Sequence, residues 1–126
     1  MSELNCTTIG NQDGSLTVPS ETVVAGSAKA WVNFNGTGTV AIRDSFNVSS
    51  ITDNGTGDYT ANFTNALANA NYCPVESSGT SGMGPTSVVR SLSFLSFTTT
   101  SVRVINTLSN TTAADVDYVC FAVLSN

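Results

Sequence analysis

The chain has 126 residues, 4 basic and 9 acidic side chains, a net charge of −5 and no histidine. This length predicts a single domain, and four basic residues are too few for the positive surface with which proteins bind nucleic acids. The lack of histidine excludes Ser-His-Asp and Cys-His catalytic sites and every zinc site that uses histidine.

The composition predicts an all-β protein. Residues that favour helices are scarce, with one Lys, one Gln and three Glu, whereas Ser, Thr and Asn together make up 48 of the 126 residues. Thr, Val and Phe, which are frequent here, favour strands. Because only 10% of the residues are charged, hydroxyl and amide groups must keep the surface hydrated.

The N-terminal residues carry no targeting signal. They lack the cationic start and the apolar centre of a secretion signal. The longest apolar stretch, residues 118–124, is far shorter than the roughly 20 residues that cross a bilayer. We therefore expect a protein that is made in the cytoplasm, stays in that cell until the cell opens, and does not insert into a membrane.

Two β-hairpins are predicted between residues 29 and 63. In each, apolar and polar residues alternate beside an Asn-Gly-Thr-Gly turn, at residues 35–38 and 54–57, where Asn and Gly tolerate the positive φ of tight turns. We expect the strand after the first turn to begin at Thr39 and the strands to follow one another as a meander. The alternating apolar residues are Ala30, Val32 and Phe34 in the first hairpin and Tyr59, Ala61 and Phe63 in the second.

Two features of these hairpins allow a binding role. Trp31 shares a strand face with Lys29 and Asn33, where it could stack on a sugar ring or, more commonly, act as a half-buried packing residue or an interface anchor. The turn from Asp53 to Asp58 carries two carboxylates that could hold calcium, but its spacing does not match an EF-hand. We take Trp31 as a candidate for surface contact and favour a plain turn over a calcium site.

The middle of the chain predicts a short irregular segment, a strand and a loop. Residues 63–72 have helical spacing of apolar residues, but four asparagines lie between Asn62 and Asn71 and disfavour a helix. We expect at most one helical turn there, followed by a strand through Tyr72 to Glu76. Residues 77–85 are rich in Gly and Ser and end in Pro, which indicates a flexible loop. Within this loop, Ser81 and Met83 are candidates for contact with a partner.

The last third of the chain predicts three further strands. The alternation of apolar residues changes phase at Leu95, which indicates a bulge, and strands are expected at 98–105 and 116–124. The final strand is apolar on both faces, and a two-layer domain covers only one of them. We therefore expect a homo-oligomer. The predicted interface residues are Val119, Phe121 and Val123, and Val116, Tyr118, Cys120, Ala122 and Leu124 form the other face.

No catalytic, metal or cofactor site is predicted. The three cysteines, Cys6, Cys73 and Cys120, lie far apart and suggest free thiols in structural roles. The six Asn-x-Ser/Thr sequences follow from composition and mean little without a secretory route. Neither Asp53 with Asp58 nor Asp115 with Asp117 forms the opposed acid and base of a glycosidase. No phosphate-binding loop is present.

The segment AKAWVNFNGTGTVAIRDSFNVSSITDNGTGDYTANFTNALANANYC, residues 28–73, resembles a segment of small tail-fibre and virion structural proteins of bacteriophages, especially marine ones. The ending DYVCFAVLSN is more loosely similar to the closing strand of tail-fibre C-terminal domains. This resemblance implies a compact antiparallel β-sandwich that assembles as a homotrimer, a location in the virion and no catalysis.

The resulting hypothesis divides the chain into a docking segment, residues 1–27, and a β-sandwich domain, residues 28–126. The docking segment would attach the domain to other virion proteins, and the domain would bind a receptor or polysaccharide on the host surface. The main alternative is a capsid decoration or cement protein on the phage head. A carbohydrate-binding module unrelated to a virion and, last, a hydrolase are further alternatives.

Overall fold

The structure is a computed structural model that describes residues 5–80, 90–108 and 112–125. These residues form ten β-strands and one short helix, and every pair of neighbouring strands is antiparallel. The prediction of an all-β protein is confirmed. Residues that favour helices are scarce, and the frequent Thr, Val and Phe side chains pack well on extended strands.

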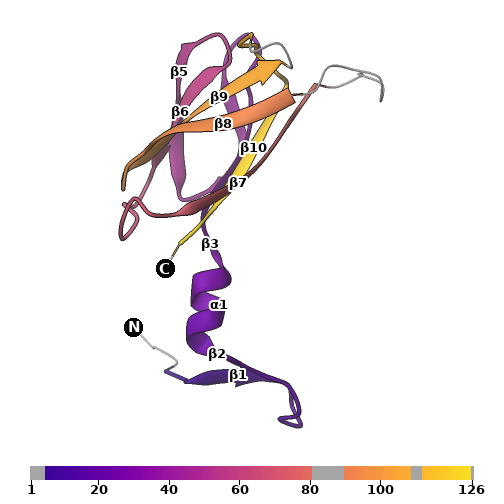
Figure 1. The fold of residues 1–126 in the computed structure, drawn as a ribbon, viewed down its shortest axis with the longest axis vertical. Helices are drawn as coiled ribbons and strands as arrows, with labels where there is room; N and C mark the ends of the chain where they lie inside the picture. Colours follow the sequence, from indigo (N-terminus) through magenta and orange to yellow (C-terminus); the bar gives the residue numbers. More distant parts are fainter. Residues whose placement is uncertain (1–4, 81–89, 109–111, 126) are drawn as a thin grey trace.

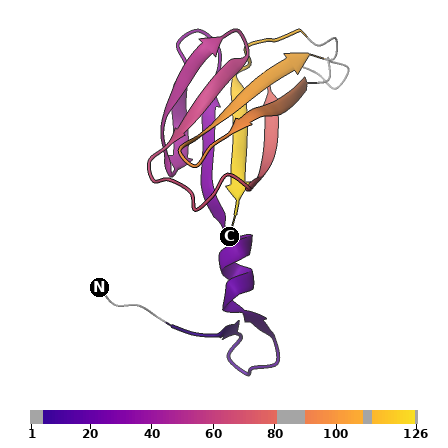
Figure 2. The same cartoon turned by 60° about the vertical axis from the view of Figure 1, so that its left-hand side comes forward.

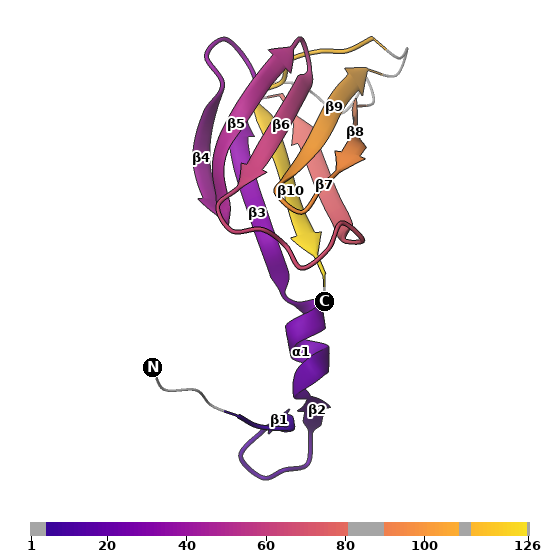
Figure 3. The same cartoon turned by 90° about the vertical axis from the view of Figure 1, so that its left-hand side faces the viewer.

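Eight of the strands form two four-stranded sheets, which lie face to face (Figures 1 and 3). The first sheet has the order β4-β3-β10-β7 and the second the order β5-β6-β9-β8. The strands of the first sheet are β4 (Ala41–Phe46), β3 (Ala28–Asn35), β10 (Tyr118–Leu124) and β7 (Cys73–Gly79). Those of the second are β5 (Val48–Gly55), β6 (Asp58–Phe63), β9 (Ser101–Leu108) and β8 (Arg90–Phe97).

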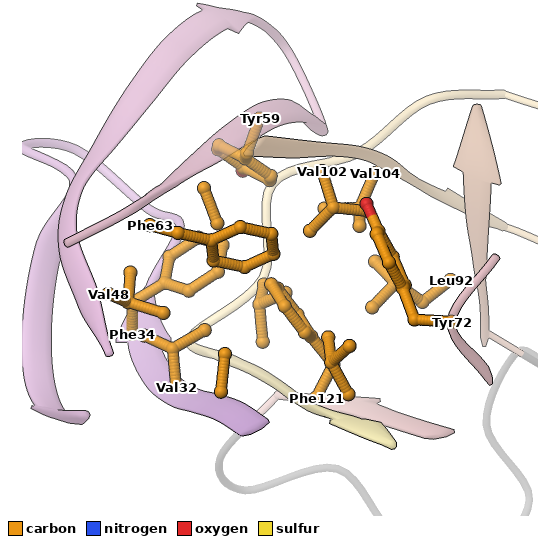
Figure 4. Close-up of a cluster of buried hydrophobic side chains, with 14 of the residues drawn as sticks. Val32, Phe34, Val48, Tyr59, Phe63, Tyr72, Leu92, Val102, Val104 and Phe121 are labelled. Atoms are coloured by element: carbon orange, nitrogen blue, oxygen red, sulfur yellow. The ribbon is translucent and has the colours of Figure 1, made fainter. Parts of the chain in front are cut away.

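The buried core lies between the two sheets and takes side chains from both. Figure 4 shows aromatic and branched side chains from opposite sheets pointing toward one another. The Phe34 and Tyr59 rings meet edge to face at 5.1 Å, and the Phe94 and Phe121 rings do so at 5.7 Å. The predicted alternation is confirmed, because the apolar residues of both hairpins are buried. They are Ala30, Val32, Phe34, Tyr59, Ala61 and Phe63.

Both hairpins are confirmed, but the meander is wrong. β3 pairs with β4 and β5 pairs with β6, yet the two pairs lie in different sheets. The chain crosses between the sheets at Asn47, which has a φ of 55°. The Asn47 amide donates to the carbonyl oxygens of Lys29 and Asn65, at 3.0 and 3.2 Å. Asn47 therefore allows the crossing in two ways. It adopts the positive φ that the bend requires, and its side chain holds the backbone at Lys29 and at Asn65 by hydrogen bonds.

The bounds of β7 and β9 differ from those predicted. Residues 64–72 contain no helix, within the expectation of at most one helical turn. The strand β7 continues to Gly79, so that the predicted loop loses its first three residues to the strand. β9 begins at Ser101 rather than 98, because the Thr98 hydroxyl oxygen accepts hydrogen bonds from the Thr100 and Ser101 amides and holds a turn. The bulge near Leu95 is confirmed by a register shift between Phe94 and Ser96.

The phase predicted for the last strand is wrong. Val119, Phe121 and Val123 are 0%, 4% and 0% exposed and fill the core, so they are not available to another copy of the chain. Tyr118 and the small side chains of Cys120 and Ala122 face outward instead. The prediction extended the alternation back to Val116, whereas β10 begins at Tyr118. The backbone before the strand is irregular, so Val116 is buried on the same side as Val119 rather than on the side of Tyr118.

Residues 5–27, which we call the stalk, project from one end of the domain, next to the end of β10 (Figures 1 and 2). The stalk contains the hairpin β1 (Thr8–Gly10) and β2 (Thr17–Pro19), followed by the helix α1 (Ser20–Gly26). No residue of α1 is buried. The Lys29 ammonium, at the start of β3, donates to the Val24 carbonyl oxygen and, at 2.8 Å, to the Ser27 hydroxyl.

Candidate functional site

Three turns gather at the end of the domain opposite the stalk (Figure 3). We call residues 36–40, 56–57 and 112–117 the distal cluster. β3 and β5 both run away from the stalk, in different sheets, so that their two Asn-Gly-Thr-Gly turns arrive at the same end. The segment before β10 lies between them, since the Gly36 amide donates to the Val116 carbonyl oxygen at 2.9 Å.

Tyr59 and Asp115 tie the distal cluster together. The Tyr59 hydroxyl lies 2.8 Å from both the Gly36 carbonyl oxygen and Asp115 Oδ1, to either of which it can donate. The Gly57 amide donates to the same Asp115 oxygen at 2.7 Å. Burial, followed by the neighbouring Asp115 carboxylate, raises the pKa of Tyr59 above its ordinary value. The phenol therefore stays protonated and serves as a structural donor rather than as a base.

The two glycines in these turns allow a close approach that no side chain would permit. A Cβ atom on Gly36 would lie 2.6 Å from the Tyr59 hydroxyl oxygen, and one on Gly57 would lie 2.6 Å from the Asn106 carbonyl oxygen. The Asn106 amide nitrogen donates to the Ala114 carbonyl oxygen at 2.7 Å and fixes the third turn. These hydrogen bonds hold the base of the distal cluster, and its exposed residues, Gly38, Thr39, Thr56, Thr112 and Asp115, offer hydroxyl, carboxylate and backbone groups.

The outer face of the second sheet is polar and linked by side-chain hydrogen bonds. The Asn62 amide donates to the hydroxyls of Ser50 and Thr52, at 3.1 and 3.0 Å. Nearby, the Asn54 amide donates to Thr60 at 2.9 Å and to Asp58 at 3.1 Å. Hydroxyl and amide groups in such rows can bind water or sugar hydroxyls, and they hold no nucleophile with an adjacent base.

The two carboxylates of the 53–58 turn are already engaged. Asp58 accepts two hydrogen bonds from the Arg103 guanidinium, at 2.9 and 2.5 Å, and Asp53 accepts one from the Gly55 amide at 3.0 Å. Within residues 5–80, 90–108 and 112–125, no cluster of three Asp, Glu or Cys side chains has the geometry of a metal site. We therefore do not propose calcium binding here.

The Asp58–Arg103 pair predicts a small dependence of stability on acid. Arg103, followed by the Asn54 amide, lowers the pKa of Asp58 below 3.8, against the effect of burial. A lowered carboxyl pKa adds stability above the ordinary value, and this contribution disappears as the pH falls through the lowered pKa. A double-mutant cycle of Asp58→Asn and Arg103→Gln should show a small stabilising coupling between the two side chains at neutral pH. Urea unfolding across acidic pH would measure it, and a coupling that stayed constant however far the pH fell below 3.8 would contradict the assignment.

The outer face of the first sheet carries one row of apolar side chains, which includes Trp31, beside a more polar row that includes Asn33 and Asp44. The register aligns four residues in one row across the sheet, with Trp31 between its partners Phe46 and Ala122, and Val75 opposite Ala122. Phe46 is 54% and Val75 49% exposed. A shallow hollow of about 350 Å³ runs beside Trp31 over Cys120 and Ala122. We call Phe46, Trp31, Ala122 and Val75 the apolar row.

The stalk also exposes apolar side chains. Ile9, Leu16, Val23 and Val24 are between 41% and 73% exposed. A two-stranded hairpin and a seven-residue helix are each marginal in water by themselves. The stalk therefore has the properties of a segment that another molecule covers.

The three cysteines are free thiols, as predicted. Cys6 and Cys73 are exposed, and Cys120 is half-buried on the outer face of the first sheet. Burial raises the pKa of the Cys120 thiol, which makes it less reactive. The chain has no histidine that could act as the base for a cysteine nucleophile.

The predicted contact residues are only partly brought together. Trp31 lies on an outer face, as expected, whereas the three predicted interface residues of β10 are in the core. Ser81 and Met83 lie outside the described residues. Asp115 and Asp117 precede β10 and are not on a strand, and the link between Asp115 and Tyr59 was not predicted. The repeated turn sequence was the one sequence feature that could have indicated this link, because each copy contains a glycine, Gly36 or Gly57, at a close contact.

Comparisons with protein-family models, with curated proteins and with solved structures found no match. No helix in the described part of the chain is both long and apolar enough to span a membrane. The function must therefore be argued from the surfaces described above.

Proposed function

We propose that the protein is a bacteriophage virion structural component, a tail-fibre-like β-sandwich domain that assembles from several copies and binds the host surface without catalysis. The resemblance of residues 28–73 to phage proteins suggests the virion and a homotrimer. The proposal places attachment to the particle in the stalk and contact with a receptor or polysaccharide at the distal cluster.

The observation that carries this proposal is the separation of the two ends. The apolar side chains of the stalk project at one end, and a cluster of hydrogen-bonded turns with exposed hydroxyl groups lies at the other (Figure 3). A domain that is held at one end presents the opposite end to its surroundings. Hydroxyl and backbone groups on a fixed frame suit hydrogen bonding to the hydroxyls of a polysaccharide.

A second candidate is a capsid decoration protein. The observation in its favour is the apolar row, because its exposed side chains, Phe46 and Val75, could pack against a capsid lattice. In that case the face of the first sheet, rather than the stalk, would attach the protein to the particle.

Removal of the stalk tests the first candidate. We expect a chain that begins at Ala28 to remain folded, because no residue of α1 is buried, and to be lost from purified particles. Quantitative mass spectrometry of particles made with the full-length and shortened chains would measure incorporation. Unchanged incorporation of the shortened chain would contradict attachment through the stalk.

The number of copies per particle separates the two candidates. A tail component is present in tens of copies, whereas a protein on the capsid lattice is present in hundreds. The same mass spectrometry, referred to the major capsid protein, gives this number. Absence of the protein from purified particles would contradict both candidates.

A further inference from the structure

The sequence Asn-Gly-Thr-Gly occurs twice, and the same reaction is open to both copies. The glycine amide nitrogen can attack Cγ of the preceding asparagine, because glycine has no Cβ atom to obstruct the approach. A cyclic imide forms, and Nδ2 leaves as ammonia with the proton that the glycine nitrogen has lost. Water then opens the imide at one of its two carbonyl groups and leaves aspartate or isoaspartate. Asn35-Gly36 and Asn54-Gly55 thus place the same reacting groups in different surroundings.

The fold holds Asn35 and Gly36 away from this reaction. The Gly36 amide, which would be the attacking group, is buried and donates to the Val116 carbonyl oxygen at 2.9 Å. A Cβ atom on Gly36 would lie 2.6 Å from the Tyr59 hydroxyl oxygen, so the residue has little room to turn. Asn35 Nδ2 donates to the Thr37 carbonyl oxygen at 2.6 Å, and Asn35 Oδ1 accepts from the Thr37 hydroxyl at 2.9 Å. Closure of the imide would have to break all of these bonds.

Asn54 and Gly55 lie in the open, at the end of the edge strand β5. In the pairing of β5 with β6, Asp53 faces Tyr59 and Gly55 faces Asp58, so Asn54 is the extra residue of a bulge. A Cβ atom on Gly55 would meet nothing within 4 Å. The Gly55 nitrogen therefore has room to approach the Asn54 side chain.

The hydrogen bonds that hold Asn54 and Gly55 are on the surface. The Gly55 amide donates to Asp53 Oδ1 at 3.0 Å, and the Asn54 amide donates to Asp58 at 3.1 Å and to Thr60 at 2.9 Å. Water can replace an exposed hydrogen bond at little cost, whereas the loss of a buried one leaves a polar group unpaired. Attack on Asn54 thus requires only exposed bonds to open.

We propose that Asn54 is a site of spontaneous deamidation in the folded protein, and that Asn35, in the same turn sequence, is protected. The product replaces the amide, which donates to Asp58 and Thr60, by a carboxylate beside Asp58. Isoaspartate also adds a methylene group to the main chain at the bulge. Either product loosens the turn that contributes residues 56–57 to the distal cluster. The inference goes beyond the proposed function and does not depend on it.

Peptide mapping of the full chain by mass spectrometry tests the site. The chain is incubated in a mildly alkaline buffer, which helps the attacking amide to lose its proton. We expect Asn54 to react about tenfold faster than Asn35, since tenfold corresponds to about 1.4 kcal/mol of activation free energy, the order of one buried hydrogen bond. In concentrated urea, both should react at similar rates. Equal rates in the folded chain, or an Asn54 that reacts only in urea, would overturn the inference.

A substitution at Asp53 tests the attacking group. Asp53→Ala releases the Gly55 amide and removes a negative charge beside it, so the rate at Asn54 should rise about threefold to tenfold. Asp44→Ala is the matched control, since Asp44 is also exposed but lies on β4, and it should leave the rate unchanged. Circular dichroism should show that both variants are folded. An unchanged rate in Asp53→Ala would contradict attack by the Gly55 nitrogen.

The effect of the product is measured with Asn54→Asp, which reproduces one of the two products directly. Asn54→Ser is its control, because serine lacks the amide but adds no charge. We expect Asn54→Asp to unfold at a lower urea concentration than Asn54→Ser, since the new carboxylate lies beside Asp58 and Asp53. Equal or higher stability of Asn54→Asp would contradict the loosening of the turn.

Discussion

Replacing Gly57 by alanine is expected to lower the free energy of unfolding by about 3–4 kcal/mol. Gly57 has a φ of 68°, and a Cβ atom there would lie 2.6 Å from the Asn106 carbonyl oxygen and 2.7 Å from the Ala114 amide nitrogen. Both are backbone atoms, so no side-chain rotation relieves the clash. The Gly57 amide would also be displaced from Asp115, which it contacts at 2.7 Å.

Gly38 provides the matched control for this prediction. It has a φ of 61° and belongs to the other copy of the same turn, but a Cβ atom there would meet nothing within 4 Å. Gly38→Ala should therefore cost only the strain of the left-handed conformation, about 1–2 kcal/mol. Urea unfolding of both variants measures the difference. Equal losses at the two positions would show that the close approach at Gly57 does not matter.

Replacing Phe121 by alanine is expected to cost about 3–5 kcal/mol of stability within a single copy. The Phe121 ring is 4% exposed and packs edge to face on Phe94 of the opposite sheet. Removal of the ring leaves a cavity between the sheets, because the closely packed neighbouring side chains cannot move far enough to fill it. The unfolding transition should move to lower urea concentration by the same amount at every protein concentration, because the contact lies inside one chain.

Tyr118→Ala is the control for Phe121. Tyr118 lies on the same strand but on the outer face, where it is 43% exposed and contacts Arg43. Its replacement should change the stability of one copy by about 1 kcal/mol or less. If Phe121→Ala instead weakened the oligomer and left a single copy stable, the sequence-based placement of Phe121 at the interface would be correct.

The sequence predicted the β3–β4 and β5–β6 hairpins because their signals are local. Alternation along β3 and β6 has a period of two residues, and the turns need glycine for the positive φ of Gly38, Gly55 and Gly57, so neither feature depends on the rest of the chain. The crossing at Asn47 has no such signal. It depends on whether β5 finds a better partner in the second sheet than in the first, which only the complete fold decides.

The phase of β10 could not be read for a different reason. Both of its faces are apolar, so hydrophobicity alone does not separate them, and one irregular residue before the strand reverses the parity. Side-chain size was the remaining signal, since β-branched Val and the large Phe121 fill a core, whereas Cys120 and Ala122 do not. The hydrogen bond between Tyr59 and Asp115 was not predicted, because it joins residues 56 positions apart and the repeated turn sequence is the one local feature connected with it.

The place of β10 in the first sheet also constrains the order of folding. β10 follows the nine other strands in the chain, yet it lies between β3 and β7 and pairs with both. During synthesis, the edges of β3 and β7 that pair with β10 therefore stay unpaired until β10 has been synthesised. Pairings this distant in sequence slow folding and expose strand edges to aggregation. The nascent chain should thus depend on chaperones, or on rapid release, until residues 118–124 are inserted.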